Sequence, residues 1–179
     1  MHYIVLDFEW NQPLSEKEML MEPFPFDSEI IEIGAIKLDE SFQTVDEFKT
    51  FIRPQFYPHL SNAVVQLTKI RPQELEKAPS FSEAFDAFID WCGDDCALCS
   101  WGPDDIPVLL DNMLLHGIPT EPFPYCYDLQ RIFARELLRE NRQCSLSDAV
   151  KMLKLPADRA HDALNDTRNT VRVCERMDL

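Results

Sequence analysis

The sequence lacks the features of several common protein classes. No apolar stretch among its 179 residues approaches the roughly 20 residues that a transmembrane helix needs. No basic segment followed by an apolar run near the N-terminus predicts a secretory signal peptide. We therefore expect no membrane partner and a cytoplasmic location. The length and the 45% hydrophobic content predict one folded domain over residues 1–179.

The six cysteines do not form a dense disulfide framework. Cys92, Cys96 and Cys99 lie close enough in sequence to suggest a zinc site. However, Cys99 belongs to an apolar run, and no Cys-x-x-Cys pair recurs downstream. Buried free thiols are therefore the favoured interpretation, and they predict a reducing compartment. A zinc protein remains an alternative that metal analysis would test.

Positive charge is scarce, and the formal net charge is −15. Residues 1–125 hold 7 Lys/Arg and 23 Asp/Glu, whereas residues 126–179 hold 10 and 9. This balance argues against a general nucleic-acid binder. A polyanionic ligand would have to approach through local basic groups or through bound cations.

Apolar periodicity and turn residues predict a mixed-sheet α/β domain. The expected strands cover residues 3–9, 30–38, 47–52 and 97–101, with a short extended piece at 125–127. The expected helices cover residues 61–70, 80–91, 128–140, 145–153 and 162–177. A further helix is expected to begin at Asp104 or Asp105 and to end before Gly117. Residues 11–28 are polar and proline-punctuated, which predicts a long loop, and we expect it to form a rim over a cleft.

The first predicted strand ends in two carboxylates. Because side chains alternate along a strand, Asp7 and Glu9 share one face with Tyr3 and Val5. Two neighbouring acids at the end of a buried strand repel each other and are costly to desolvate. A divalent cation between them would offset that cost, although a strand that runs into a wet loop can also carry two acids by chance.

Two further motifs place acids near helix starts. Asp104 and Asp105 follow a Gly-Pro turn, and ordinary helix capping accounts for one of them. His161 precedes a predicted helix that carries Asp166 in its first turns, so both side chains can reach the same site. Alternatively, His161 lies on the surface and Asp166 pairs with Arg168 or with solvent.

Arginines recur at helical spacing in two rows, which are Arg131, Arg135 and Arg139, and Arg168, Arg172 and Arg176. Solvated helix faces are the favoured interpretation, because acidic neighbours at this spacing pair with arginine. A track for phosphate groups is the functional alternative.

Together these motifs resemble the DEDDh branch of the DnaQ-like 3′–5′ exonucleases over nearly the whole chain. That branch carries Asp-x-Glu on the first strand, an Asp at a middle helix and His-x-Ala-x-x-Asp near the C-terminus. Here these motifs are Asp7-Phe8-Glu9, Asp105, and His161 to Asp166. Asp105 is preferred over Asp104 because the family aspartate follows Trp-Gly-x-x.

The finer resemblance is to the enhancer-of-RNAi type exoribonucleases and to the bacterial sporulation-inhibitor type exonucleases. These proteins carry Leu-Thr-Gly-Ile followed by Ala-Pro-x-Phe. This chain has Leu67 to Ile70 and Ala78 to Phe81 in their place, with Lys69 where the glycine is usual.

The resemblance implies an RNase H-like fold, a mixed five-stranded sheet flanked by helices. It also implies that two Mg²⁺ or Mn²⁺ ions bind Asp7, Glu9, Asp105 and Asp166. His161 would then be the general base and would act together with Glu9 in catalysis.

The same resemblance predicts the substrate contacts, which are Phe8, Trp10, Leu67, Thr68 and Trp101. For Trp101, a place in the core is an equally good interpretation. We expect a metal-dependent 3′–5′ exonuclease that degrades single-stranded RNA in preference to DNA and releases nucleoside 5′-monophosphates. The alternatives are a DNA proofreading or repair exonuclease and a catalytically weak nucleic-acid-binding module. The sequence does not identify a protein partner.

Overall fold

A mixed five-stranded sheet forms the centre of the molecule. The computed structural model describes residues 1–139 and 142–177. The strands run in the order β3-β2-β1-β4-β5. Their bounds are β1 (His2–Asn11), β2 (Glu29–Leu38), β3 (Thr44–Phe51), β4 (Cys96–Ser100) and β5 (Tyr125–Asp128). The first three form an antiparallel meander, and β4 and β5 continue the sheet in parallel with β1. The predicted mixed five-stranded sheet is confirmed.

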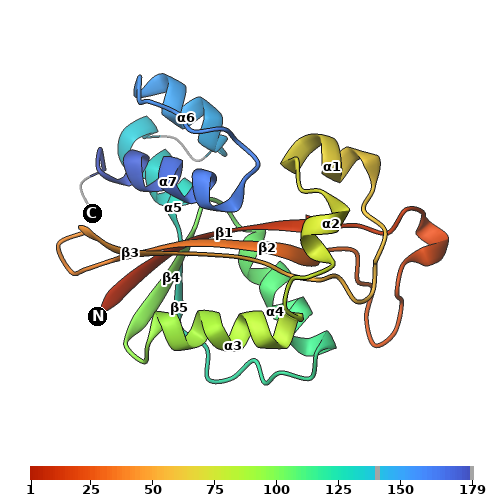
Figure 1. Cartoon of the computed structure of the whole chain (residues 1–179). Helices are drawn as coiled ribbons and strands as arrows, with labels where there is room; N and C mark the ends of the chain where they lie inside the picture. Colours follow the sequence, from red (N-terminus) through yellow and green to blue (C-terminus); the bar gives the residue numbers. More distant parts are fainter. Residues whose placement is uncertain (140–141, 178–179) are drawn as a thin grey trace.

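Helices cover both faces of this sheet (Figure 1). One face packs against α3 (Phe81–Cys92) and α4 (Asp105–Leu115). The other face packs against α5 (Leu129–Phe133), α6 (Leu146–Met152) and α7 (Ala163–Cys174). The short helices α1 (Asn62–Thr68) and α2 (Pro72–Leu75) lie on the same side as α7, with Ile31 in the core beneath them. None of the helices described here is long and apolar enough to cross a membrane.

The alternation along β1 divides its side chains between the two cores. Ile4, Leu6 and Phe8 belong to the core under α3 and α4, whereas Val5 belongs to the core under α5, α6 and α7. This is the arrangement that the period of two predicts. It leaves the acids at positions 7 and 9 on the side of α7.

The helices differ from the predictions where the backbone turns. The predicted helix 61–70 ends at Thr68, because Lys69 adopts a left-handed conformation with φ of 67°. That conformation favours glycine, which explains the usual family residue at this position. The predicted helix 128–140 is divided into α5 and a π-helical turn, Ala134–Leu138, and its residue 140 lies outside the described part of the chain.

The long loop 11–28 is more ordered than its composition predicts. It contains a short 3₁₀ turn, Glu16–Glu18, and an antiparallel bridge between Leu20 and Phe26. Phe26 is buried, and its ring stacks on Tyr57. The buried Phe26 ring therefore holds this loop against the rest of the molecule.

The start of α7 presses directly onto β2. A Cβ atom added to Gly34 would lie 2.2 Å from the backbone of Ala163 and Leu164, so only glycine permits this approach. The hydroxyl of Thr167 donates a hydrogen bond to the Gly34 carbonyl at 3.1 Å. This packing fixes the start of α7 beside the end of β1.

The six cysteines are free, and Cys92, Cys99, Cys144 and Cys174 are buried. Within the described residues, no three of them bring metal-ligating atoms together. The structure therefore favours the free-thiol interpretation over the zinc alternative.

Candidate active site

Two carboxylates project from the end of β1. Asp7 pairs with Gly34 and Glu9 pairs with Glu32 in the antiparallel register with β2. The register shifts between Glu9 and Trp10, as at a β-bulge. Bulges often redirect side chains next to functional sites. Glu9 is 8% exposed, so its carboxylate has lost most of its contact with water.

A third carboxylate comes from α4. Asp105 is 6% exposed, and its Oδ1 accepts a hydrogen bond from the backbone N–H of Phe8 at 3.2 Å. Asp104 occupies the N-cap position without a side-chain capping bond, and it is exposed. The bond from Phe8 therefore joins the start of α4 to the acidic end of β1 through Asp105.

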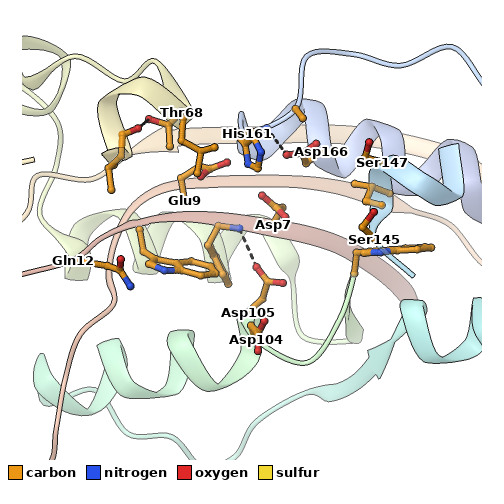
Figure 2. Close-up of a pocket in the computed structure, with 17 residues that line it drawn as sticks. Asp7, Glu9, Gln12, Thr68, Asp104, Asp105, Ser145, Ser147, His161 and Asp166 are labelled. Carbon is orange, nitrogen blue, oxygen red and sulfur yellow. Dashed lines mark hydrogen bonds between the residues drawn. The ribbon is translucent and has the colours of Figure 1, made fainter. Parts of the chain in front are cut away.

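The fourth carboxylate and the imidazole belong to the approach to α7. His161 has a φ of 60°, a left-handed conformation that is uncommon for a non-glycine residue. Its backbone N–H donates to Asp166 Oδ2 at 2.7 Å. One ligand atom each from Glu9, His161 and Asp166 lies within 4.8 Å of the others. The strained turn thus brings the imidazole to the carboxylates, as Figure 2 shows.

Burial and mutual repulsion raise the pKa values of this cluster. Burial raises the pKa of Asp7 well above its ordinary value, and the charges of Asp105 and Glu9 add to the shift. Burial, followed by the charges of Glu32 and Asp166, raises the pKa of Glu9 to about 8.

The other two carboxylates respond to burial in the same direction. Burial raises the pKa of Asp105 to about 7 against the opposing hydrogen bond from Phe8. The pKa of Asp166 is also raised by burial, although the backbone N–H of His161 opposes the shift. All four acids are therefore costly to ionise in the metal-free protein.

These residues are suited to divalent cations. None of the described residues that line the pocket is a lysine or an arginine, so no side chain there balances the acids. Hard cations such as Mg²⁺ and Mn²⁺ prefer carboxylate oxygens. A bound cation would lower the pKa values of these acids, because it favours their ionised form.

The cluster lies at the middle of an elongated pocket of about 560 Å³ (Figure 2). All ten residues predicted for the site line it, namely Asp7, Phe8, Glu9, Trp10, Leu67, Thr68, Trp101, Asp105, His161 and Asp166. The Phe8 side chain itself is buried in the core with α3 and α4. Of loop 11–28, only Gln12 lines the pocket, so the rim predicted for that loop rests on one described residue.

Trp101 satisfies both of its sequence interpretations. It lines the pocket, and its ring also packs on Phe133 with centroids 5.4 Å apart. Its indole N–H donates to the Cys144 carbonyl at 3.0 Å. The indole is therefore held in a fixed orientation at the pocket wall.

Sequence reasoning missed an ionic network behind the histidine. Lys49 Nζ lies 2.7 Å from Glu32 Oε1 and 2.8 Å from Asp162 Oδ2. Arg159 lies 3.3 Å from the same Asp162 oxygen and donates to the Thr68 carbonyl at 3.1 Å. The network joins β2, β3, the turn before α7 and the end of α1. These four segments are distant in sequence, so no local motif could have revealed it.

The pocket also has polar walls that no motif indicated. Gln12, Ser145 and Ser147 line it in addition to the predicted residues. The two serines lie at the start of α6, where Ser145 accepts a capping bond from the N–H of Asp148. For Ser145 the capping position was the only signal in the sequence, and Ser147 carried none.

Comparison with known proteins places these features in a family. Residues 4–174 match the RNase T exonuclease family. Human ERI1 exoribonuclease 2 is 24% identical over 208 residues, which cover 98% of this chain and 28% of that protein. The probable 3′–5′ exonuclease KapD of Bacillus subtilis is 25% identical over 123 residues, covering 68% of this chain and 56% of that protein.

A further relative is a polymerase. The PolC-type DNA polymerase III of Thermotoga maritima is 32% identical over 172 residues, which cover 96% of this chain and 11% of that protein. The chain therefore spans less than two thirds of the length of these curated relatives.

Solved structures share the fold. The nuclease domain of 3′hExo, a DEDDh family member bound to rAMP, superposes with a TM-score of 0.82 at 23% identity. The match covers 98% of this chain and 90% of that one. Escherichia coli exonuclease I in complex with a dT13 oligonucleotide gives a TM-score of 0.73 at 15% identity, covering 98% and 40%.

Proposed function

The chain belongs to the RNase T exonuclease family, and on that premise we propose that it is a metal-dependent 3′–5′ exonuclease of the DEDDh type. It removes nucleoside 5′-monophosphates from the 3′ end of a single strand, with RNA preferred over DNA. The observation that carries this proposal is the grouping of four carboxylates and one imidazole in one pocket without a balancing cationic side chain.

Asp7, Glu9, Asp105 and Asp166 hold two Mg²⁺ or Mn²⁺ ions in this proposal. When bound, such ions supply Lewis-acid chemistry that lowers the pKa of an attacking water and neutralises charge on the scissile phosphate. Glu9 also contributes to catalysis, because its carboxylate lies beside the imidazole.

His161 is the general base. The proton of the attacking water passes to an imidazole nitrogen, because histidine is the side chain that most often serves as a general base. The left-handed backbone of His161 and the hydrogen bond from its N–H to Asp166 hold the ring near the carboxylates.

The terminal nucleotide binds at the end of the pocket formed by β1 and α1. Leu67 is 51% exposed, so an apolar side chain is available there for contact with a base. The hydroxyl of Thr68 donates to the Val64 carbonyl and accepts from the N–H of Ile70, which fixes the turn that presents Leu67. In the same proposal β1 contacts the nucleotide through Trp10 and through the backbone of Phe8, whose side chain is buried, as the family resemblance implies.

Relatives support both sugar chemistries. The human relative is named an exoribonuclease, which favours RNA, whereas the Thermotoga relative is a DNA polymerase, which supports DNA proofreading or repair as the second candidate.

We propose a cytoplasmic location, because all six cysteines are free and four of them are buried.

The test uses 5′-labelled single-stranded RNA and DNA of one sequence, with Mg²⁺, Mn²⁺ or EDTA. We expect a ladder that shortens from the 3′ end and is lost with EDTA and in the Asp7→Ala variant, with RNA degraded faster. Faster degradation of DNA would favour the second candidate, a DNA proofreading or repair exonuclease. No degradation of either strand by protein that binds Mn²⁺ would refute the exonuclease and support a binding module.

A further inference from the structure

The catalytic pocket has two distinct ends. One end is formed by α1 through Val64, Leu67 and Thr68, and the other is formed by Trp101 and the start of α6. In Figure 2 the acids and His161 lie between Thr68 on one side and the α6 serines on the other. A strand that crosses the acids must therefore extend toward both ends.

The proposed function gives this pocket a direction. The scissile phosphate has to lie at the acids, and the terminal nucleotide lies at the α1 end in the proposal above. The nucleotides upstream of the cleavage site must consequently leave toward Trp101 and α6. This step rests on the proposed function.

A second hollow lies beyond the α6 end. It has a volume of about 170 Å³, and it is lined by Asp128, Gln130, Arg131, Ala134, Arg142 and Gln143. Its wall is joined to the wall of the catalytic pocket by one carbonyl. The Cys144 oxygen accepts both the Trp101 indole N–H and the Gln130 side-chain amide, each at 3.0 Å. The two hollows are therefore neighbours on opposite sides of residue 144.

Arg131 places a positive charge in the second hollow, where a ligand could contact it. Its side chain is exposed, and it forms no ion pair with the part of the chain that the structure describes. The carboxylate of Asp128 in the same hollow accepts from the backbone N–H of Arg131 at 2.9 Å, which engages it as the cap of α5.

The first two arginines of the second row, Arg168 and Arg172, lie on α7 and differ in this respect. Arg168 pairs with Glu47, and Arg172 pairs with Asp158 at 2.8 Å. Arg131 therefore differs from Arg168 and Arg172, because it forms no ion pair within the described residues and also lines the hollow next to the catalytic pocket.

We propose that the hollow at Arg131 binds the backbone phosphates of the substrate strand upstream of the cleavage site. The strand passes from the acids, over Trp101 and the start of α6, to Arg131 and the polar side chains of Gln130 and Gln143. Contact with phosphate supplies affinity without reading sequence, so this path serves any single strand of sufficient length. It also explains how a chain with a net charge of −15 holds a polyanion away from its ions.

A length series with the full chain tests this path. We would measure kcat/KM with Mn²⁺ on single-stranded RNA of 3 and 12 nucleotides, for the wild type, Arg131→Ala and Arg131→Lys. Arg131→Ala is expected to lower kcat/KM on the 12-mer by roughly fivefold to tenfold, to leave the 3-mer unchanged and to weaken the salt dependence. Arg131→Lys keeps the charge and is expected to retain most of the wild-type value.

The matched control is Arg172→Ala, which removes the same charge from an arginine that Asp158 already engages. It should leave the length dependence unchanged. Equal losses on both lengths, or no loss on the 12-mer, would overturn the path while leaving the exonuclease intact. No cleavage of either length by the wild type would instead refute the proposed function, and the path with it.

Discussion

Removing the charge of Glu9 is expected to stabilise the metal-free protein at alkaline pH. Burial and neighbouring acids raise the pKa of Glu9 from 4.5 to about 8. A group with a raised pKa in the folded state stabilises that state fully below pH 4.5, and the contribution is lost as the pH rises to about 8. For Glu9 this corresponds to about 4–5 kcal/mol over the window, or about 1.4 kcal/mol per pH unit.

The Glu9→Gln variant isolates this contribution, because glutamine resembles the protonated acid in shape. In EDTA the two proteins should unfold with similar free energies at pH 5. At pH 8 the variant should be more stable by up to about 4 kcal/mol, since the wild type must hold the ionised group beside Asp7 and Asp166. The assay is urea denaturation at several pH values between 5 and 8.

Three features of the experiment keep the interpretation specific. Burial lowers the pKa of His116, so its contribution to stability is lost as the pH falls, which is the opposite direction to Glu9, but it is common to both proteins and cancels in the difference. Glu76→Gln changes an exposed acid and should leave the free energy of unfolding unchanged at both pH 5 and pH 8. Saturating Mn²⁺ should stabilise the wild type more than Glu9→Gln, because the variant lacks one carboxylate ligand. A Glu9→Gln protein no more stable than the wild type at pH 8 in EDTA would refute the reasoning.

Three further predictions follow from the same geometry. Asp105→Asn should lower the exonuclease rate roughly 100-fold or more, whereas Asp104→Asn should stay within about threefold, as the rates of RNA shortening would show. His161→Ala should lower kcat by about 10²–10⁴-fold while Mn²⁺ titration still shows binding, and wild-type turnover would contradict its role as base. Lys49→Met leaves the Glu32 carboxylate, whose side chain is 1% exposed, without its cation, so denaturation should show a loss of about 3 kcal/mol. Lys49→Arg should lose much less, and equal losses would indicate a packing effect.

The sequence predicted the sheet because its signals are local, whereas the residues that line the pocket were grouped by the family resemblance over nearly the whole chain. The apolar alternation of β1 sets which face Asp7 and Glu9 occupy, and the structure confirms that alternation. The order of the DEDDh motifs predicted that His161 and Asp166 share a site with Glu9. In the structure, one ligand atom from each of these three residues lies within 4.8 Å of the others. The match to the RNase T exonuclease family confirms the family, and the superposition on the nuclease domain of 3′hExo confirms the fold class.

What the sequence did not reveal depends on contacts between distant segments. The contact of Lys49 with Glu32 and Asp162 requires that β3 lie beside β2 and that α7 begin above both. The close approach at Gly34 has the same origin, because a glycine in a strand does not show what presses against it. The early end of α1 at Lys69 was hidden for another reason, since lysine is a good helix former and seldom adopts a left-handed backbone.

The charge distribution follows from the requirements of the site. Arg159 and Lys49 lie close behind His161, yet their cationic groups are engaged by Asp162 and Glu32 and do not line the pocket. A lysine inserted among the catalytic acids would neutralise them and compete with metal ions for the same oxygens. Positive charge for the substrate must therefore lie outside the acidic cluster, and the hollow at Arg131 is next to the end from which the strand leaves. In the proposed path, separation of the two charges would let bound ions act on the scissile phosphate while Arg131 contacts the phosphates upstream.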